Sequence, residues 1–118
     1  MGKYLYRLQY TRAGLDGTVK EGFAKREAYF RKSVDGLGGT TEAAYWAYGD
    51  TDVFIVVDLP GQDKATGLAL SLAETGSFRV TTTTLLTAAE MDAAAKHMPS
   101  YRAAGAQGGG RTRTRSKG

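Results

Sequence analysis

The chain has 118 residues, and its 16 lysines and arginines against 12 aspartates and glutamates give a net charge of +4. This length fits one domain with one hydrophobic core, and the lack of cysteine excludes disulfides, thiolate metal sites and cysteine nucleophiles. All 12 acidic residues and 11 of the basic ones lie in residues 1–101, so this part carries −1 and the basic character belongs to the C-terminal end.

The first predicted elements are a strand and a long helix. Residues 3–10 are rich in tyrosine and alternate between two kinds of side chain, which predicts a strand with two different faces. From about Leu15 to Leu37, apolar residues recur at helical spacing. We therefore predict one amphipathic helix, irregular near Gly17 and Gly22, which ends at the glycines of residues 35–39.

Two strand-like segments follow, residues 40–48 and 52–59, and the short stretch around Gly49 between them predicts a hairpin. The second segment is apolar on both faces, as is typical of a strand in the middle of a sheet. The remaining segments are predicted as a helix, a threonine-rich strand and a short helix with Thr87 and Glu90 at capping-box spacing: residues 62–76, 77–86 and 87–98.

This element order is β-α-β-β-α-β with an extra helix, which predicts an α+β, ferredoxin-like fold. We expect a four-stranded antiparallel sheet in the order fourth, first, third, second strand, with both main helices on one face. The other face would carry apolar side chains, so we expect a second copy of the chain to cover it and form a homodimer of the dimeric α/β barrel type. Residues 1–98 would form this domain, and residues 99–118 a disordered, basic, glycine- and arginine-rich tail.

Three segments resemble a known family. They are "YLYRLQYT", "YWAYGDTDVFIVVDLP" and "LALSLAETGSFRVTTTTLLT", and in order and spacing they are similar to the GYD domain, a family of small bacterial proteins related to the dimeric α/β barrels. The resemblance covers about residues 4–96. The family's Gly-x-Tyr-Asp turn aligns with residues 49–52, where Thr51 replaces the tyrosine. The resemblance implies the fold and a homodimer, and it names no reaction.

The turn motif of Gly49, Asp50 and Asp52 has two interpretations. Two carboxylates so close could bind a divalent cation, but such a site needs several more oxygen ligands, and no acidic cluster lies nearby in the sequence. We favour the alternative, in which one aspartate accepts hydrogen bonds from the turn's own backbone N–H groups. Neither a metal nor another cofactor is therefore expected.

A ligand site is predicted on the sheet face away from the helices. Tyr45 and Trp46 are adjacent in a strand and must point to opposite faces, so one of them would face this side. An aromatic ring with a few polar groups is typical of small-molecule pockets. The predicted ligand-binding residues are Arg7, Gln9, Tyr45, Trp46 and Thr82. The alternative is that these side chains only fill the dimer core.

The leading functional hypothesis is a homodimeric small-molecule-binding or interaction module, with no catalytic residue predicted. Nothing approaches the ~20 apolar residues that span a bilayer, and the first ten residues lack a signal-peptide pattern, so we expect a cytoplasmic protein. One alternative is an oxygenase-like enzyme, since some relatives of the fold bind haem through a helical histidine and His97 is the single histidine. A surface histidine at a helix C-terminus is the simpler interpretation.

A third hypothesis concerns the tail. Its basic residues could contact nucleic-acid phosphates without sequence preference and with strong salt dependence. The cations beyond Arg102 are Arg111, Arg113, Arg115 and Lys117. A tail that only increases solubility is at least as well supported by five charges.

Overall fold

The structure is a computed structural model that describes residues 1–105, and the chain divides into a unit Met1–Leu86 and a second unit that begins at Thr87. The elements of the first unit are β1 (Gly2–Tyr10), α1 (Arg12–Glu21), α2 (Phe23–Gly36), β2 (Thr40–Trp46), β3 (Val53–Leu59), α3 (Gln62–Glu74) and β4 (Phe78–Leu85). The second unit contains α4 (Ala88–Ala95). Residues 1–98 are predicted to form one domain, whereas the division places α4 with the C-terminal part of the chain.

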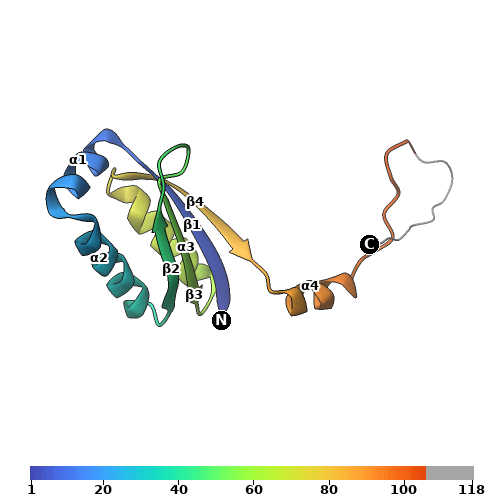
Figure 1. Cartoon of the computed structure of the whole chain (residues 1–118). Helices are drawn as coiled ribbons and strands as arrows, with labels where there is room; N and C mark the ends of the chain where they lie inside the picture. Colours follow the sequence, from blue (N-terminus) through green and yellow to red (C-terminus); the bar gives the residue numbers. More distant parts are fainter. Residues whose placement is uncertain (106–118) are drawn as a thin grey trace. The chain divides into compact units, whose positions relative to one another are not determined.

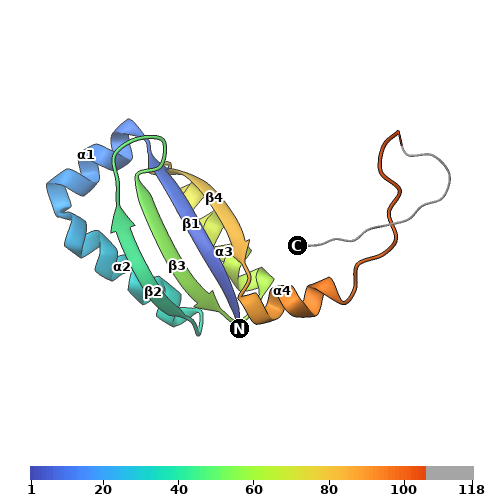
Figure 2. The same cartoon turned by 45° about the vertical axis from the view of Figure 1, so that its right-hand side comes forward.

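The four strands form one antiparallel sheet in the order β2-β3-β1-β4, and α2 and α3 lie on the same face of it (Figures 1 and 2). This confirms the predicted α+β class and strand order. The apolar third strand pairs on both edges, as its composition indicates. The other face, which we call the open face, is covered by no helix of the unit Met1–Leu86 and carries Lys3, Leu5, Arg7 and Gln9 on β1.

The core lies between the sheet and the helices, because alternate residues of the two central strands point to that side. In β3 the pattern is regular, with Val53, Ile55, Val57 and Leu59 all at most 3% exposed. The other buried hydrophobic side chains come from β1, α2 and α3: Tyr4, Tyr6, Leu8, Val34, Ala65 and Leu68. Burial of a valine, leucine or isoleucine side chain in this core contributes ~1.5–3 kcal/mol.

Tyr6 stands at the centre of this core. Its hydroxyl donates a hydrogen bond to the backbone carbonyl of Ala65, which connects β1 to α3. Its ring meets Phe30 of α2 edge to face, with centroids 6.2 Å apart. Burial raises the pKa of Tyr6 to about 12, because the charged phenolate would lose its hydration. One side chain therefore holds both helices on the sheet.

The prediction of one helix from Leu15 to Leu37 is wrong, because the helix is interrupted at Gly22. Gly22 has a φ of +110°, a conformation that residues with a Cβ rarely adopt, and it ends α1 and precedes α2. Apolar spacing continues across the break, but α1 leaves Leu15 and Val19 43% and 63% exposed. Gly14 and Thr18 are its buried residues instead.

Hydrogen bonds of Thr11 and close packing of Gly14 hold α1 against the loop that precedes β4. Thr11 caps the helix by accepting a hydrogen bond from the Gly14 N–H, and its own N–H donates to the Ser77 carbonyl at 2.9 Å. Its hydroxyl also donates to the Gly76 carbonyl at 2.7 Å. Gly14 packs so closely here that a Cβ would lie 2.1 Å from the Ser77 oxygen.

In the second unit, α4 begins with the predicted capping box, in which Thr87 and Glu90 exchange side-chain and backbone hydrogen bonds. None of the helices in residues 1–105 has both the length and the apolar composition needed to cross a membrane. The tail cations at positions 111, 113, 115 and 117 lie outside the described residues, so the nucleic-acid hypothesis stays a prediction.

Candidate functional site

A β-bulge decides which aromatic residue of β2 faces the helices. The register of β2 against β3 shifts between Thr41 and Ala43, so Thr41 and Ala44 both pair with helix-facing residues of β3. Trp46 then also lies on the helix side, and Tyr45 lies on the open face, 70% exposed. Without the bulge, regular alternation from Thr41 would have placed Tyr45 on the helix side and Trp46 on the open face.

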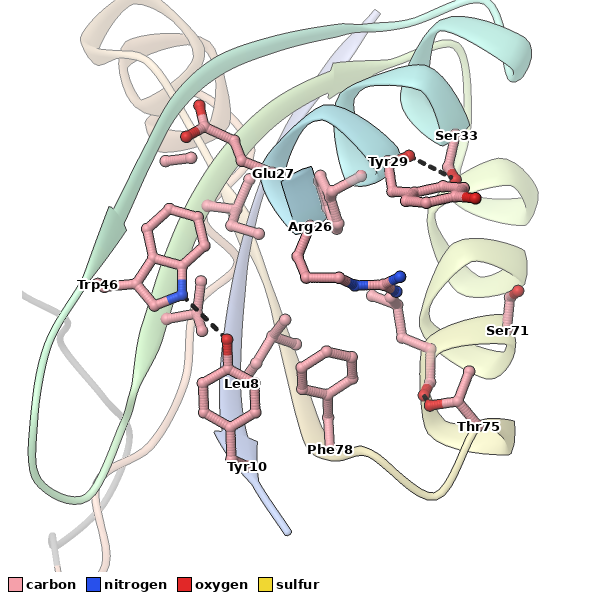
Figure 3. A pocket seen from close by; sticks show the side chains of 15 residues that line it. Leu8, Tyr10, Arg26, Glu27, Tyr29, Ser33, Trp46, Ser71, Thr75 and Phe78 are labelled. Atoms are coloured by element: carbon pink, nitrogen blue, oxygen red, sulfur yellow. Dashed lines mark hydrogen bonds between the residues drawn. The ribbon is translucent and has the colours of Figure 1, made fainter. Parts of the chain in front are cut away.

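A pocket of about 170 Å³ opens between α2, α3 and the helix-facing side of the sheet, as Figure 3 shows from close by. The sheet contributes mainly apolar and aromatic side chains: Leu8, Tyr10, Ala44, Trp46, Val53, Ile55 and Phe78. The helices contribute Phe30 and Leu72, together with the polar or charged residues Arg26, Glu27, Tyr29, Ser33, Ser71 and Thr75. An apolar chamber with few polar groups is the usual composition of a small-molecule site.

Aromatic contacts hold one end of the pocket. Tyr10 packs against Phe78 with centroids 5.4 Å apart and meets Phe23 edge to face at 6.4 Å. Phe23 in turn meets Trp46 edge to face at 6.2 Å. Such pairs contribute ~0.5–1.5 kcal/mol each beyond their burial, so this wall is a well-defined surface.

Tyr10 and Trp46 also share a hydrogen bond, in which the indole Nε1–H donates to the Tyr10 hydroxyl oxygen at 3.0 Å (Figure 3). The Tyr10 backbone is fixed as well, since its N–H donates to the Asp52 carboxylate at 2.9 Å. The Asp52 N–H donates to the Leu8 carbonyl at 2.9 Å. The hairpin turn therefore holds the end of β1 that carries Tyr10.

The charged residues near the pocket are paired. Arg26 lies 4.9 Å from the centroid of the Tyr29 ring, and its guanidinium contacts the Glu21 carboxylate at 3.1 Å. Glu27 is paired with Arg31 at 2.9 Å. Two cations are thus balanced by two anions around the pocket.

The open face has an apolar middle and a charged end. The register aligns Ala43, Val56, Leu5 and Thr83 across the four strands. At the end of the sheet, the Lys3 ammonium contacts the carboxylates of Glu42 and Asp58, the latter at 3.1 Å. The hydrogen bond to Glu42 and then that to Asp58 raise the pKa of Lys3.

The family model of the GYD domain matches residues 4–95 of the chain. The chain belongs to the GYD domain family. This match contains β1 from Tyr4 onward, the other three strands, the pocket and α4. No curated protein matches the sequence significantly.

The predicted ligand residues of this GYD domain do not share one face. Arg7, Gln9 and Tyr45 are on the open face, whereas Trp46 and Thr82 are on the helix side. Thr82 pairs with the fully buried Tyr6, which fixes its side. Of the five, only Trp46 lines the pocket.

The turn of the GYD domain also differs in one detail from its prediction. The Asp52 carboxylate accepts its hydrogen bond from Tyr10 on β1, and not from the turn's own backbone. Within residues 1–105, no three Asp, Glu, His or Cys side chains come close enough together to hold a metal ion. His97 is exposed and follows α4 in the second unit, where its N–H donates to the Ala94 carbonyl at 2.9 Å.

Sequence reasoning missed most of the pocket. Tyr10 lies on the strand face that also contains Tyr4, Tyr6 and Leu8. These alternating large side chains indicate in the sequence which face of β1 packs against the helices. Phe30 fits the helical periodicity and Phe78 alternates with Val80. The sequence pattern does not predict the pocket itself, because the space between α2 and α3 depends on how far apart the two helices pack.

Proposed function

We propose that this GYD domain is a homodimeric small-molecule-binding module that holds its ligand in the pocket between α2 and α3. The observation that carries the proposal is the pocket itself, a chamber of about 170 Å³ with aromatic walls and a few polar groups. An apolar cavity of ~150 Å³ is large enough to bind benzene. The pocket therefore fits a molecule with one ring and small substituents.

The pocket offers binding groups without the parts of a catalytic site. The hydroxyls of Ser33 and Thr75 donate to the backbone carbonyls of Tyr29 and Leu72, so neither is paired with a general base that would make it a nucleophile. Arg26 and Glu27 are each engaged in an ion pair. Binding is thus the function that these side chains support.

Ligand binding can be tested with the one tryptophan of the chain. Trp46 gives a single indole N–H signal in a ¹H–¹⁵N spectrum, and this group lies in the pocket wall. We expect one-ring molecules to shift this signal in a saturable way. In Ala44→Leu, where the new side chain would fill part of the pocket, the shift should be lost.

Ala43→Leu is the matched control, because Ala43 is the next residue along β2 but pairs with Val56 on the open face. This variant should still bind. If both leucine variants bind as well as the wild type, or if no one-ring molecule shifts the indole signal, the pocket proposal fails.

The homodimer would form through the open face. Its support is the exposed apolar surface there, with Phe54 37% and Tyr45 70% exposed beside the half-buried Leu5 and Val56. The charges of Lys3, Glu42 and Asp58 are internally paired, so they do not oppose contact with a second copy. Two equal faces meeting about a two-fold axis would cover both apolar centres.

Sedimentation at micromolar concentration tests this part separately. We expect twice the monomer mass for the wild type, and the monomer for Phe54→Glu, which would place a charge in the interface. Leu70→Glu is the control, because Leu70 is 66% exposed on α3 and should not affect association. A monomeric wild type would overturn the homodimer while leaving the ligand pocket to its own test.

A further inference from the structure

We propose that the pocket selects a compact, uncharged one-ring molecule that presents a hydrogen-bond acceptor, such as a carbonyl oxygen, to the hydroxyl of Tyr10. This proposal rests on the proposed function and names the class of ligand at that same site. It has three supports, which are the direction of one proton, the size of the chamber and the pairing of the charges around it.

The direction of the Tyr10 hydroxyl hydrogen follows from the hydrogen bond between Trp46 and Tyr10. An indole Nε1–H can only donate a hydrogen bond, so in its contact with Trp46 at 3.0 Å the Tyr10 oxygen is the acceptor. The single hydroxyl hydrogen of Tyr10 must therefore point away from Trp46. Among residues 1–105 this hydroxyl donates no hydrogen bond to another protein group, and accepting a bond from the indole makes it a better donor.

The size and lining of the chamber set the shape of the ligand. A volume of about 170 Å³ is slightly more than the ~150 Å³ that holds benzene, which leaves room for a ring and a small substituent. The rings of Phe30 and Phe78 and the side chains of Leu8 and Leu72 are apolar partners for the ring. One polar substituent would then face Tyr10.

The charges argue against an anionic ligand. Arg26 is the cation that lines the pocket, and its guanidinium is already paired with Glu21 at 3.1 Å. Glu27, also in the lining, is paired with Arg31 at 2.9 Å. Because Glu21 already balances the charge of Arg26, a carboxylate would gain less there than beside an unpaired cation and would lose more hydration than a neutral carbonyl.

Three probes of similar size separate these features. Acetophenone has a carbonyl oxygen, α-methylstyrene has a methylene group in the same place, and benzoate carries a negative charge. Dissociation constants from backbone amide shifts of the full-length protein should rank acetophenone about two- to tenfold tighter than α-methylstyrene, as expected for one hydrogen bond. Benzoate should bind more weakly than acetophenone.

Tyr10→Phe should remove the preference for acetophenone over α-methylstyrene, because it deletes the hydroxyl and retains the ring. Tyr48→Phe is the matched control, since Tyr48 is fully exposed and outside the pocket lining, and it should retain the preference. Trp46→Phe should weaken the preference without abolishing it, because the Tyr10 hydroxyl remains but the indole no longer orients it. A preference that survives Tyr10→Phe and disappears in Trp46→Phe would show that the indole is the donor and overturn the proposal.

The outcomes also distinguish this proposal from the proposed function. If acetophenone and α-methylstyrene bind the wild type equally, or benzoate binds most tightly, the ligand class is wrong while the pocket still binds. If no probe binds and the Trp46 indole signal does not move, both proposals fail. The comparison of probes uses the wild-type protein alone, so the proposal can be tested even if a substitution impairs folding.

Discussion

Replacing Gly14 by alanine should destabilise the fold strongly, although alanine is the best helix former. The new Cβ would lie 2.1 Å from the Ser77 oxygen, so α1 would have to move by about 1.3 Å to reach an ordinary contact of 3.4 Å. Such a movement breaks the Thr11 bonds to the carbonyls of Ser77 and Gly76, which are 2.9 and 2.7 Å long.

The magnitude follows from these losses. Two hydrogen bonds contribute ~0.5–1.5 kcal/mol each, and forcing an extra carbon into a packed contact costs ~1–3 kcal/mol. The higher helix propensity of alanine returns ~0.5–1 kcal/mol. We expect the free energy of unfolding to fall by about 1–5 kcal/mol, and the thermal midpoint of a unit this small to fall by at least ~4 °C.

Gly17→Ala is the control, because Gly17 lies in the same helix and a Cβ there would meet nothing within 4 Å. That variant should gain ~0.5–1 kcal/mol. Urea and thermal unfolding followed by circular dichroism measure both. If Gly14→Ala is as stable as Gly17→Ala, the close approach of α1 to Ser77 does not hold in solution and the reasoning is refuted.

Three further predictions concern polar groups that are buried or half-buried. Because burial raises the pKa of Tyr6 from 10.0 to about 12, its neutral form stabilises the fold below pH 10, and this contribution should be lost as pH rises toward 12; Tyr6→Phe should remove that part of the pH dependence of unfolding, and an unchanged profile would contradict it. Thr41 has a buried hydroxyl with no hydrogen-bond partner among the described residues, so Thr41→Val should unfold at the same or a higher urea concentration, and a clear loss would count against this. Asp52→Ala should cost ~1–3 kcal/mol in urea unfolding by leaving the Tyr10 N–H unpaired, whereas Asp50→Ala, at an exposed turn position, should cost less than ~0.5 kcal/mol; equal effects would refute the role of Asp52.

The order of the strands could be predicted because local patterns and topology agree. The doubly apolar segment around Ile55 had to lie inside the sheet, and the four threonines from Thr81 favour a strand over a helix. The interruption between α1 and α2 could not be predicted from the sequence in the same way. Apolar spacing runs through Gly22, and only the backbone conformation of that residue separates the two helices.

The candidate site was harder to predict, because it depends on a one-residue irregularity. A strand alternates its side chains with a period of two, so one extra residue moves every later side chain to the other face. The bulge between Thr41 and Ala43 does this to Tyr45 and Trp46. Nothing in the residues of β2 indicates a bulge, and therefore sequence alone left open which ring faces the helices.

The most direct test of the central claim is the position of a bound one-ring molecule in the wild-type protein. Intermolecular nuclear Overhauser effects from the methyl group and ring of acetophenone should reach the rings of Trp46, Phe30 and Phe78 in the pocket. Contacts with Leu5 and Phe54 instead would place the ligand on the open face and contradict the account.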